Sequence, residues 1–566
     1  MQILKRHNQR LNIALLTGFM LTLAMMIYNL PNVGNNLMPR NFLAWVGIVM
    51  ILTPILILQF GTKTLRWHQA ITGLFLPPLA ILIHSIILPP TEFGQYYVWT
   101  TAGATFLFAL ALLAMLQLRV SRNAWLFLAS TLLVVITVQM YLSTIAPKAP
   151  ELANWVRSLP IELNAKFGGF QQRNLMASFL SASVLWVWYL MLKGKNHSLV
   201  EWLGFAAVSY MAAWGIYDSS SRVGSLSILF GVGAFVSFSL FKKQFKSLIP
   251  AIAIVLAITP TLSNEKGVVA KASKGVEHSS ITVRVDFLNV SAELFQQAPM
   301  LGHGIGNFSE KYNEQSIARA KEGVPQRHLS GLLHPHNETA MWAVETGTFG
   351  LLFIVLPFTA AIIWLVIKKS AYPVLALIAI FPIALHSQVE MPLQASGIHW
   401  WLVAMILGSS FRAHLSKPIA LPKPRLNQIG IGIAGILATL TLSDAAMAAH
   451  QRWLLAVHGP SQMSAAKYIQ AIHNSPAANH WILKTDVLDV WSLRALRLGN
   501  ETKNIELIEA ILPRVEEGQS RWYSTAYWLA TSGAYHALGE SQKLEQHWKN
   551  INLVHSPWIQ QISGTF

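Results

Sequence analysis

The residues best suited to chemistry lie in one polar interruption of an otherwise apolar sequence, at roughly residues 263–348. His334 and His336 stand near its end in the run HPHNE, and Arg284 lies further upstream. Histidine is the natural side chain for moving protons near neutral pH, and arginine holds phosphate with a planar, bidentate set of donors. This combination predicts proton-transfer chemistry on a phosphate-bearing substrate beside a membrane.

Two further arginines stand at the boundaries of apolar stretches. Arg222 lies in DSSSRVG, and Arg173 lies in FGGFQQRN. Charged residues at such junctions tend to mark a site, although Arg222 could also cap a helix or reach toward lipid headgroups. Arg284 has a similar alternative, since it could pair with Asp286. Together the arginines are candidates for holding a phosphate.

The run GHGIGNF, from Gly302 to Phe308, resembles a nucleotide-binding fingerprint only superficially, because no strand and following helix frame it. Its glycines Gly304 and Gly306 predict a tight backbone turn whose N–H groups face an anion. His334 and His336 could instead bind a metal with Glu338. Two histidines two residues apart across a proline form a poor chelate, so we expect no metal.

The elements that must position these residues are membrane helices. Hydrophobic residues make up 53% of the chain and charged residues 12%, which is far from the composition of a soluble domain. Thirteen apolar stretches are long enough to cross a bilayer, so we predict an all-α, polytopic membrane protein. They are 11–30, 42–60, 70–88, 100–118, 124–142, 175–192, 199–217, 223–241, 247–262, 349–367, 371–387, 398–411 and 427–445.

The positions of the basic residues predict the orientation. A cytoplasmic N-terminus places in the cytoplasm a set of loops that contain Lys and Arg but no Asp or Glu, as short cytoplasmic loops require. These loops are 5–10, 63–66, 119–122, 193–195, 242–246, 368–369 and 412–425. The net charge of +17 therefore reflects topology, and we expect no nucleic-acid partner. Zero cysteines fits exposure in the periplasm of a bacterial inner-membrane protein.

The last part of the chain changes character. Short amphipathic segments at 461–472, 485–498, 504–517, 523–538 and 541–551 are separated by Pro, Gly or Asn, which predicts stacked helical hairpins. We therefore expect a transmembrane domain at 1–445, which includes the periplasmic loop 263–348, and a periplasmic α-helical domain at 446–566. The helical domain is either a small cap or a docking surface for a protein partner.

Three separated motifs resemble those of the O-antigen ligase and O-oligosaccharyltransferase superfamily. They are His336-Asn337 followed after nine residues by Gly347-x-x-Gly350, Ser221-Arg222-x-Gly224, and Arg284 followed by the glycine turn. Residues 167–175 and 386–393 are similar to segments of the protein glycosylation ligases in particular. Arg173 replaces the usual proline, and residues 394–397 replace the usual aromatics, which suggests a specialised branch such as the pilin-specific enzymes.

The resemblance implies a reaction and a set of roles. A glycan would pass en bloc from undecaprenyl pyrophosphate to a Ser or Thr hydroxyl of a periplasmic protein, such as a type IV pilin. His336 would act as the base, while Arg222, Arg284 and Arg173 would hold the pyrophosphate. The residues expected to support them are Asn337, Gly304 and Gly306. The lipid pyrophosphate carries the activation, so no cofactor is expected, and the partners are this donor, the acceptor protein and the bilayer.

Other functions share parts of this pattern. The acceptor could be the lipid A core, as for an O-antigen ligase, or another glycan, as for a Wzy-type polymerase. Outside enzymes, thirteen helices could form a transporter or flippase. That function predicts inverted repeats and charged or broken helices at mid-membrane. We find no such repeat, and the polar motifs cluster at the outer boundary.

Overall fold

The computed structural model is helical apart from one short ribbon of two strands in the residues it describes. These residues are 39–60, 64–67, 69–118, 120–145, 151, 170, 172–194, 197–259, 280–324, 332, 334–366, 371–411, 418–421, 424–462, 467, 470–471, 474–481, 483–522 and 525–554. The prediction of an all-α, polytopic membrane protein is confirmed.

Nine helices within the described ranges are long and apolar enough to cross a membrane. Three more predicted spans are shorter apolar helices, at Phe245–Ile258, Val374–His386 and Gly397–Ser410. The first predicted span, 11–30, lies outside the described residues. The predicted span 70–88 is interrupted at Phe75, where one helix ends and the next begins.

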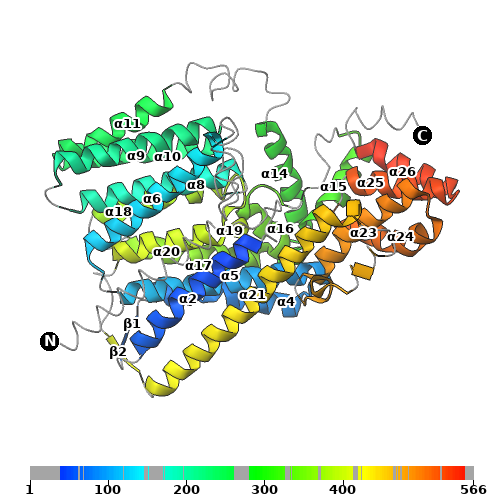
Figure 1. Ribbon diagram of the computed structural model, residues 1–566, viewed down its shortest axis with the longest axis horizontal. Helices are drawn as coiled ribbons and strands as arrows, with labels where there is room; N and C mark the ends of the chain where they lie inside the picture. The colour runs from blue at the N-terminus through cyan, green and yellow to red at the C-terminus, as the bar shows by residue number, and fades with distance from the viewer. Residues whose placement is uncertain are drawn as a thin grey trace. The chain divides into compact units, whose positions relative to one another are not determined.

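The chain forms two compact units. Unit 1 falls within residues 1–76, 104–275 and 357–446, and unit 2 within 77–103, 276–356 and 447–566. Figure 1 labels their helices. The residues of α5 (Glu92–Gln117) and α21 (Pro424–Gln462) are divided between the units. Helix α21 continues without a break past residue 445, where the last predicted span ends.

Unit 1 is built around α8 (Arg173–Leu192), whose side chains from Leu175 to Leu192 are all buried. A helix that is apolar all round must be enclosed by others. Small residues along α8, such as Ser178 and Ala182, let its neighbours approach closely. The other helices of the unit are α2 (Pro39–Phe60), α3 (Gln69–Leu74), α6 (Arg122–Ile145), α9 (Leu199–Asp218), α10 (Arg222–Phe241), α11 (Ile249–Ile258), α17 (Leu356–Val366), α18 (Ala371–His386), α19 (Pro392–Ala395) and α20 (Gly397–Phe411).

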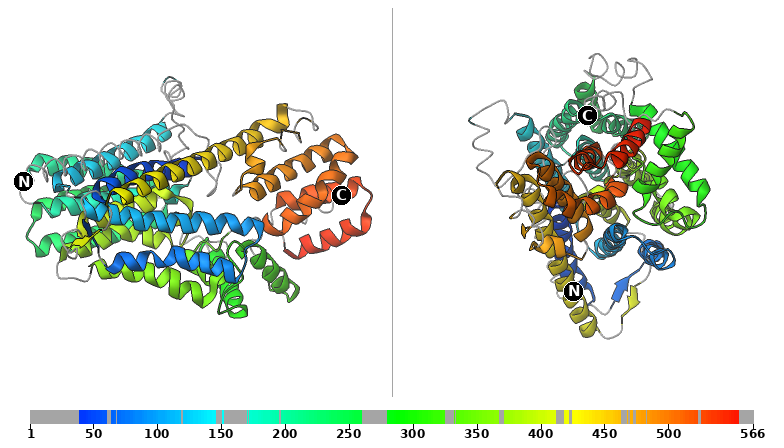
Figure 2. Two further views of the ribbon diagram at one scale, coloured as in Figure 1. Left: turned by 90° about the horizontal axis from the view of Figure 1, so that it is seen from below. Right: turned by 90° about the vertical axis from the view of Figure 1, so that its right-hand side faces the viewer.

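A two-stranded ribbon, which the sequence analysis did not predict, joins two loops of unit 1. Strand β1 (Thr64–Arg66) pairs in antiparallel fashion with β2 (Pro418–Ala420), with Leu65 opposite Ile419. The two arrows lie beside each other in Figure 2. Both strands belong to basic segments that the charge pattern predicts on one side of the membrane, and the pairing brings these two segments together at one end of the unit.

Unit 2 contains residues 276–348 of the polar interruption, and the described part of this segment is largely helical. Its helices are α4 (Leu76–Ile87), α14 (Ser280–Gln297), α15 (Phe308–Lys321) and α16 (Glu338–Gly350). Helix α16 continues through a π-helical turn, Leu351–Val355, so the predicted span at 349–367 begins earlier than expected. The tail supplies α23 (Lys484–Thr502), α24 (Ile505–Trp522), α25 (Thr525–Ala537) and α26 (Ser541–Val554), close to four of the five predicted segments.

Candidate active site

His336 stands in a strained backbone conformation directly before α16. Its φ is +52°, in the left-handed region that non-glycine residues rarely adopt. The imidazole stacks on Phe287 of α14 at 5.6 Å between ring centroids and 14° between planes. The His334 ring meets it edge-on at 4.5 Å, and the His336 backbone N–H donates to His334 Nδ1 at 3.3 Å. Strain that persists in a well-braced loop tends to accompany function.

Asn337 begins α16. Its side-chain oxygen accepts from the backbone N–H of Ala340 at 2.8 Å, the bond of a helix N-cap. Because the cap fixes where the helix starts, it also fixes where the preceding His336 stands. This gives Asn337 a supporting role through the backbone.

The glycine turn is attached to α16 by backbone hydrogen bonds. The N–H groups of His303 and Gly304 donate to the carbonyls of Val344 and Glu345, each at 2.9 Å. In the opposite direction, Thr348 donates to the carbonyl of Pro299 at 2.8 Å. The N–H of Gly304 is therefore used within the protein, contrary to the expectation that the turn presents it to an anion. Gly304 and Gly306, with φ of +94° and +84°, instead shape a brace for α16.

Glycine is required where the turn meets the helix. A Cβ on Gly302 would lie 2.4 Å from the Glu345 carbonyl carbon, and one on Gly347 would lie 2.6 Å from the Met300 carbonyl carbon. Gly347 forms a kink inside α16, with φ +61° and ψ −154°. The Glu345 carboxylate is buried beneath the turn and accepts from the Phe308 N–H at 3.3 Å. The His336-Asn337 motif and the Gly347 motif thus occupy the start and the kink of one helix.

Arg284 lies on α14, one helical turn before Phe287, the residue against which His336 stacks. Residues three apart are neighbours on a helix surface. His336 therefore stacks on α14 one helical turn from Arg284.

A polar groove lies further along α14. It has a volume of about 430 Å³ and is lined by Glu293, Gln296, Gln297, Gln315, Arg319, Glu322 and Val324. Its side chains are held in place by one another, because Gln315 and Arg319 of α15 donate to the Glu293 carboxylate at 2.8 and 2.9 Å. Amides and carboxylates fixed in this way can bind the hydroxyl groups of a polar ligand.

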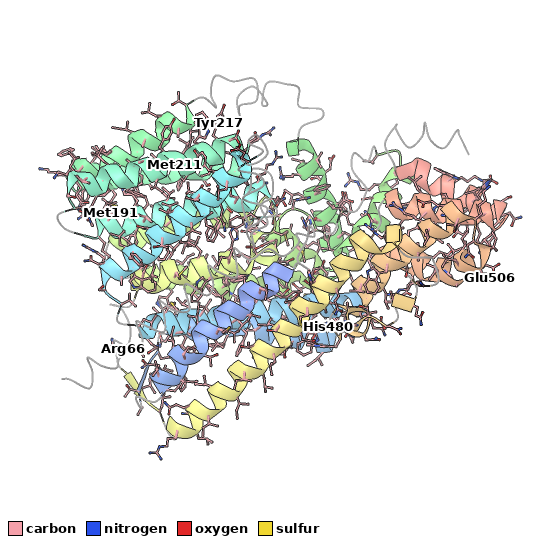
Figure 3. The ribbon with its side chains drawn as sticks, viewed as in Figure 1. Arg66, Met191, Met211, Tyr217, His480 and Glu506 are labelled. Carbon is pink, nitrogen blue, oxygen red and sulfur yellow. The ribbon has the colours of Figure 1, made fainter. Side chains whose placement is uncertain are left out.

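Arg222 and Arg173 are brought together in unit 1. Ser221 donates to the Asn174 side-chain oxygen at 2.8 Å, which joins the residues adjacent to the two arginines. A Cβ on Gly224 would lie 2.4 Å from the Ala177 Cβ, so glycine is what allows α10 to approach α8 here. Tyr217, labelled in Figure 3, marks this end of the unit, just before the loop that leads to Arg222.

The positions of these two arginines suit an anion. Each is the first residue of its helix, α8 for Arg173 and α10 for Arg222. A helix N-terminus carries about half a positive charge, so a cation placed there is disfavoured unless an anion is also bound. Two helix starts joined by a hydrogen bond, each with an arginine, concentrate positive charge at one end of unit 1.

A buried network of histidines and serines holds the first turns of α8. His399 Nε2 lies 3.2 Å from the Leu175 carbonyl and 3.2 Å from Ser178 Oγ. Since a carbonyl can only accept, Nε2 carries the proton. Nδ1 of His399 is then the acceptor for the Ser396 hydroxyl at 2.8 Å. Ser178 Oγ also lies 2.9 Å from His386 Nδ1. The network ties α18 and α20 to the helix that begins with Arg173.

Residues 206–355 match the family model described as O-antigen ligase. This match supports the chain's membership of the O-antigen ligase superfamily. It supports a glycan-transferring enzyme of the ligase or polymerase type, in a multi-pass membrane protein. The O-antigen ligase match includes Arg222, Arg284, the glycine turn and His336, whereas Arg173 lies outside it. No curated protein matches the chain.

The structure adds residues that the sequence analysis did not single out. They are His84, whose Nε2 lies 2.7 Å from the carbonyl of Leu301, the residue before the glycine turn, together with Glu345 and His399. Each is an ionisable residue within an apolar helix. Such residues are a default indication of a site, so the signal was present in the sequence.

Proposed function

We propose that this protein transfers a preassembled glycan from undecaprenyl pyrophosphate to a Ser or Thr hydroxyl of a periplasmic protein, such as a type IV pilin. The main support is the braced, left-handed His336 at the start of α16, within the region that matches the O-antigen ligase family. The glycan-transferring class is common to the whole superfamily. The choice of a protein acceptor is the specific part of the proposal.

On the donor side, the arginines would stabilise the leaving pyrophosphate. Negative charge builds on its oxygens as the glycosidic bond breaks, and planar guanidinium groups can meet those oxygens with paired hydrogen bonds. Arg222 and Arg173, at two joined helix starts, and Arg284, on α14, are the residues proposed for this role.

On the acceptor side, His336 would take the proton of the attacking hydroxyl. A Ser or Thr hydroxyl is a weak nucleophile, and a positioned base typically accelerates such attack by ~10²–10⁴-fold. Stacking on Phe287 fixes the plane of the imidazole, and the Asn337 cap fixes its place in the chain. The bond between the glycan and the lipid pyrophosphate breaks in this step and supplies the activation, so the proposal includes no cofactor or metal.

The topology of the proposal follows from the basic loops. The N-terminus would lie in the cytoplasm, and the His336 loop and the tail would lie in the periplasm of a bacterial inner membrane. Residues 446–566 would then form a periplasmic helical domain beside the membrane domain 1–445. The polar groove between α14 and α15 would face the glycan in the same compartment.

The acceptor can be identified with purified components. The protein in lipid nanodiscs is incubated with a lipid-linked glycan and with either a pilin or lipid A core, and each product is measured by intact mass. We expect the pilin to gain the mass of one glycan at a Ser or Thr. Transfer only to lipid A core would make the protein an O-antigen ligase, and elongation of the donor itself would make it a polymerase.

The substitution Arg222→Lys tests whether Arg222 binds the pyrophosphate of the donor. Lysine keeps the charge but loses the planar fork, so we expect transfer to fall at least tenfold while the protein still inserts in the membrane. Arg425→Lys, the same change at an exposed residue of α21, is the control and should keep wild-type transfer. Equal activity of the two variants would exclude Arg222 from pyrophosphate binding.

A further inference from the structure

A second group of cations surrounds a pocket at the opposite end of α8 from Arg173. The pocket has a volume of about 310 Å³. Its lining comprises Arg66, Val120, Arg122, Trp125, Leu190, Lys193, Gly408, Ser409 and Ser410, all in unit 1. Figure 3 labels Arg66 and Met191 on this edge of the unit. Since α8 has 20 residues, the pocket and Arg173 are separated by ~30 Å along the helix.

The backbone of Arg66 is held firmly. The buried side chain of Gln117 accepts from the Arg66 N–H at 2.9 Å and donates to the Arg66 carbonyl at 2.7 Å. The pairing of β1 with β2 holds the strand that carries Arg66, in which Leu65 lies opposite Ile419 and Arg66 opposite Pro418. The guanidinium therefore extends from a backbone that the Gln117 side chain bonds at both its N–H and its carbonyl.

The other two cations are held by close packing. A Cβ on Gly194 would lie 2.1 Å from an Arg122 guanidinium nitrogen, so the glycine leaves the space that the guanidinium occupies. Lys193, just beyond α8, lies 3.3 Å from the Tyr189 hydroxyl and 3.4 Å from the Ser409 carbonyl. Burial lowers the pKa of Lys193, as expected where a positive charge is partly removed from water.

The lining contains three cations and two hydroxyl groups, and no acidic residue is among its members. Glu201 lies 3.2 Å from His197 Nδ1 and is already engaged in capping α9 with Ser198. The guanidinium of Arg122 donates to the Asn123 side-chain oxygen at 3.0 Å, and its Nε is buried with no hydrogen-bond partner among the described residues. The pocket thus offers converging donors and an excess of positive charge.

We propose that this pocket binds the headgroup phosphate of an anionic phospholipid. Its four remaining lining residues are the apolar Val120, Trp125 and Leu190 together with Gly408, and they belong to membrane helices or their immediate ends. An amphipathic ligand needs this combination, whereas a free phosphate ion would leave the apolar walls unused. Basic pockets between transmembrane helices on the cytoplasmic side are suited to anionic lipid headgroups.

The proposal is independent of the acceptor and of the glycan. A lipid phosphate bound here would join the ribbon at Arg66, the start of α6 at Arg122 and the end of α8 at Lys193. Helix α8 is the central helix of unit 1, and α6 packs against it. The bound lipid would therefore stabilise the end of the unit that lies opposite the paired arginines.

Lipid retention by the delipidated protein tests the site. The protein is titrated with phosphatidylglycerol or with phosphatidylcholine, and bound lipid is counted by native mass spectrometry. We expect a tightly bound phosphatidylglycerol in wild type and about tenfold or greater loss of its affinity in the double variant Arg122→Gln, Lys193→Gln. The single variant Lys193→Gln should lose part of the affinity for phosphatidylglycerol. If the double variant does not fold, this single variant is compared with wild type instead.

The control removes the same number of charges elsewhere. Lys242→Gln with Lys243→Gln changes two exposed lysines at the end of α10, and it should retain the lipid as wild type does. Equal loss in this control would show general charge attraction and overturn the proposal. Equal retention of phosphatidylcholine by wild type would also overturn the proposal. Displacement of the lipid by millimolar inorganic phosphate would overturn it as well, because the pocket would then be a simple anion site.

Discussion

The two regions that carry the candidate residues are built by different means. In unit 1, side chains hold one another: Ser221 bonds Asn174 beside the arginines, and Ser178 lies within hydrogen-bond distance of both His386 and His399. In unit 2, backbone conformation and backbone hydrogen bonds hold the candidate residues in place. His336 has a left-handed φ, and the glycine turn and α16 exchange N–H to carbonyl bonds.

This difference predicts which substitutions each region tolerates. In unit 1, a replacement should succeed when it puts the same donor or acceptor atom in the same place. In unit 2, side chains can be exchanged if the backbone keeps its conformation, but an added Cβ at a tightly packed glycine should be disruptive. Variants that separate atom placement from backbone conformation can test both statements.

The largest effect is expected on the rate of glycan transfer in His336→Gly, which removes the imidazole and also relieves the backbone strain. Glycine adopts φ +52° without strain, whereas a left-handed residue with a Cβ costs roughly 1–2 kcal/mol. His336→Gly should therefore unfold no earlier than His336→Ala, yet lose the ~10²–10⁴-fold that a general base contributes. Thermal unfolding in detergent and the rate of transfer from a lipid-linked donor would be measured on the same preparations.

Two controls accompany this pair. His334→Ala should be milder than either His336 variant, because the ring of His334 supports the loop from the side. Wild type should keep its rate in the presence of a chelator. Full activity of His336→Gly would end the assignment of His336 as the base, and loss of wild-type activity with chelator would point to a bound metal.

The second effect concerns the glycine brace. Gly302→Ala would place a Cβ 2.4 Å from the Glu345 carbonyl carbon at a φ of +70°, with an expected cost of about 2–5 kcal/mol from strain and overpacking. Gly204→Ala on α9 is the matched change in unit 1, where nothing lies within 4 Å, and it should leave stability unchanged or slightly raised. Comparable unfolding temperatures for the two variants would contradict a backbone-held site.

Sequence patterns predicted the parts of this molecule that depend on local order. Apolar length and amphipathic spacing predicted most of the helices, and the His336 and Arg222 motifs lie in the region of the family match. Contacts between distant residues were not predictable in this way. The bonds from Gln117 to Arg66 and from His399 to Ser178 join positions that no local pattern relates. The left-handed φ of His336 also depends on tertiary packing, since histidine itself favours other conformations.

The third effect tests atom placement in unit 1. A glutamine amide at position 399 can reach the place of His399 Nε2 and donate to the Leu175 carbonyl, whereas asparagine reaches only as far as Nδ1, beside Ser396. His399→Asn should therefore lose about 1–2 kcal/mol of stability and raise the KM for the lipid-linked donor, because α8 carries Arg173. His399→Gln should restore both. If glutamine and asparagine behave alike, the histidine fills space and its hydrogen bonds do not position α8.

The smallest effect is expected at Asn337, where the backbone-held arrangement of unit 2 depends on one side-chain atom. Asn337→Ala removes the acceptor for the Ala340 N–H and should cost about 1 kcal/mol, as the loss of an N-cap usually does. Asn337→Ser keeps an acceptor at the cap and should keep both stability and transfer. Because the cap acts on His336 only through the start of α16, the alanine variant should lower the rate far less than His336→Gly. A serine variant that folds like wild type but fails to transfer would mean that the amide itself contacts the substrate.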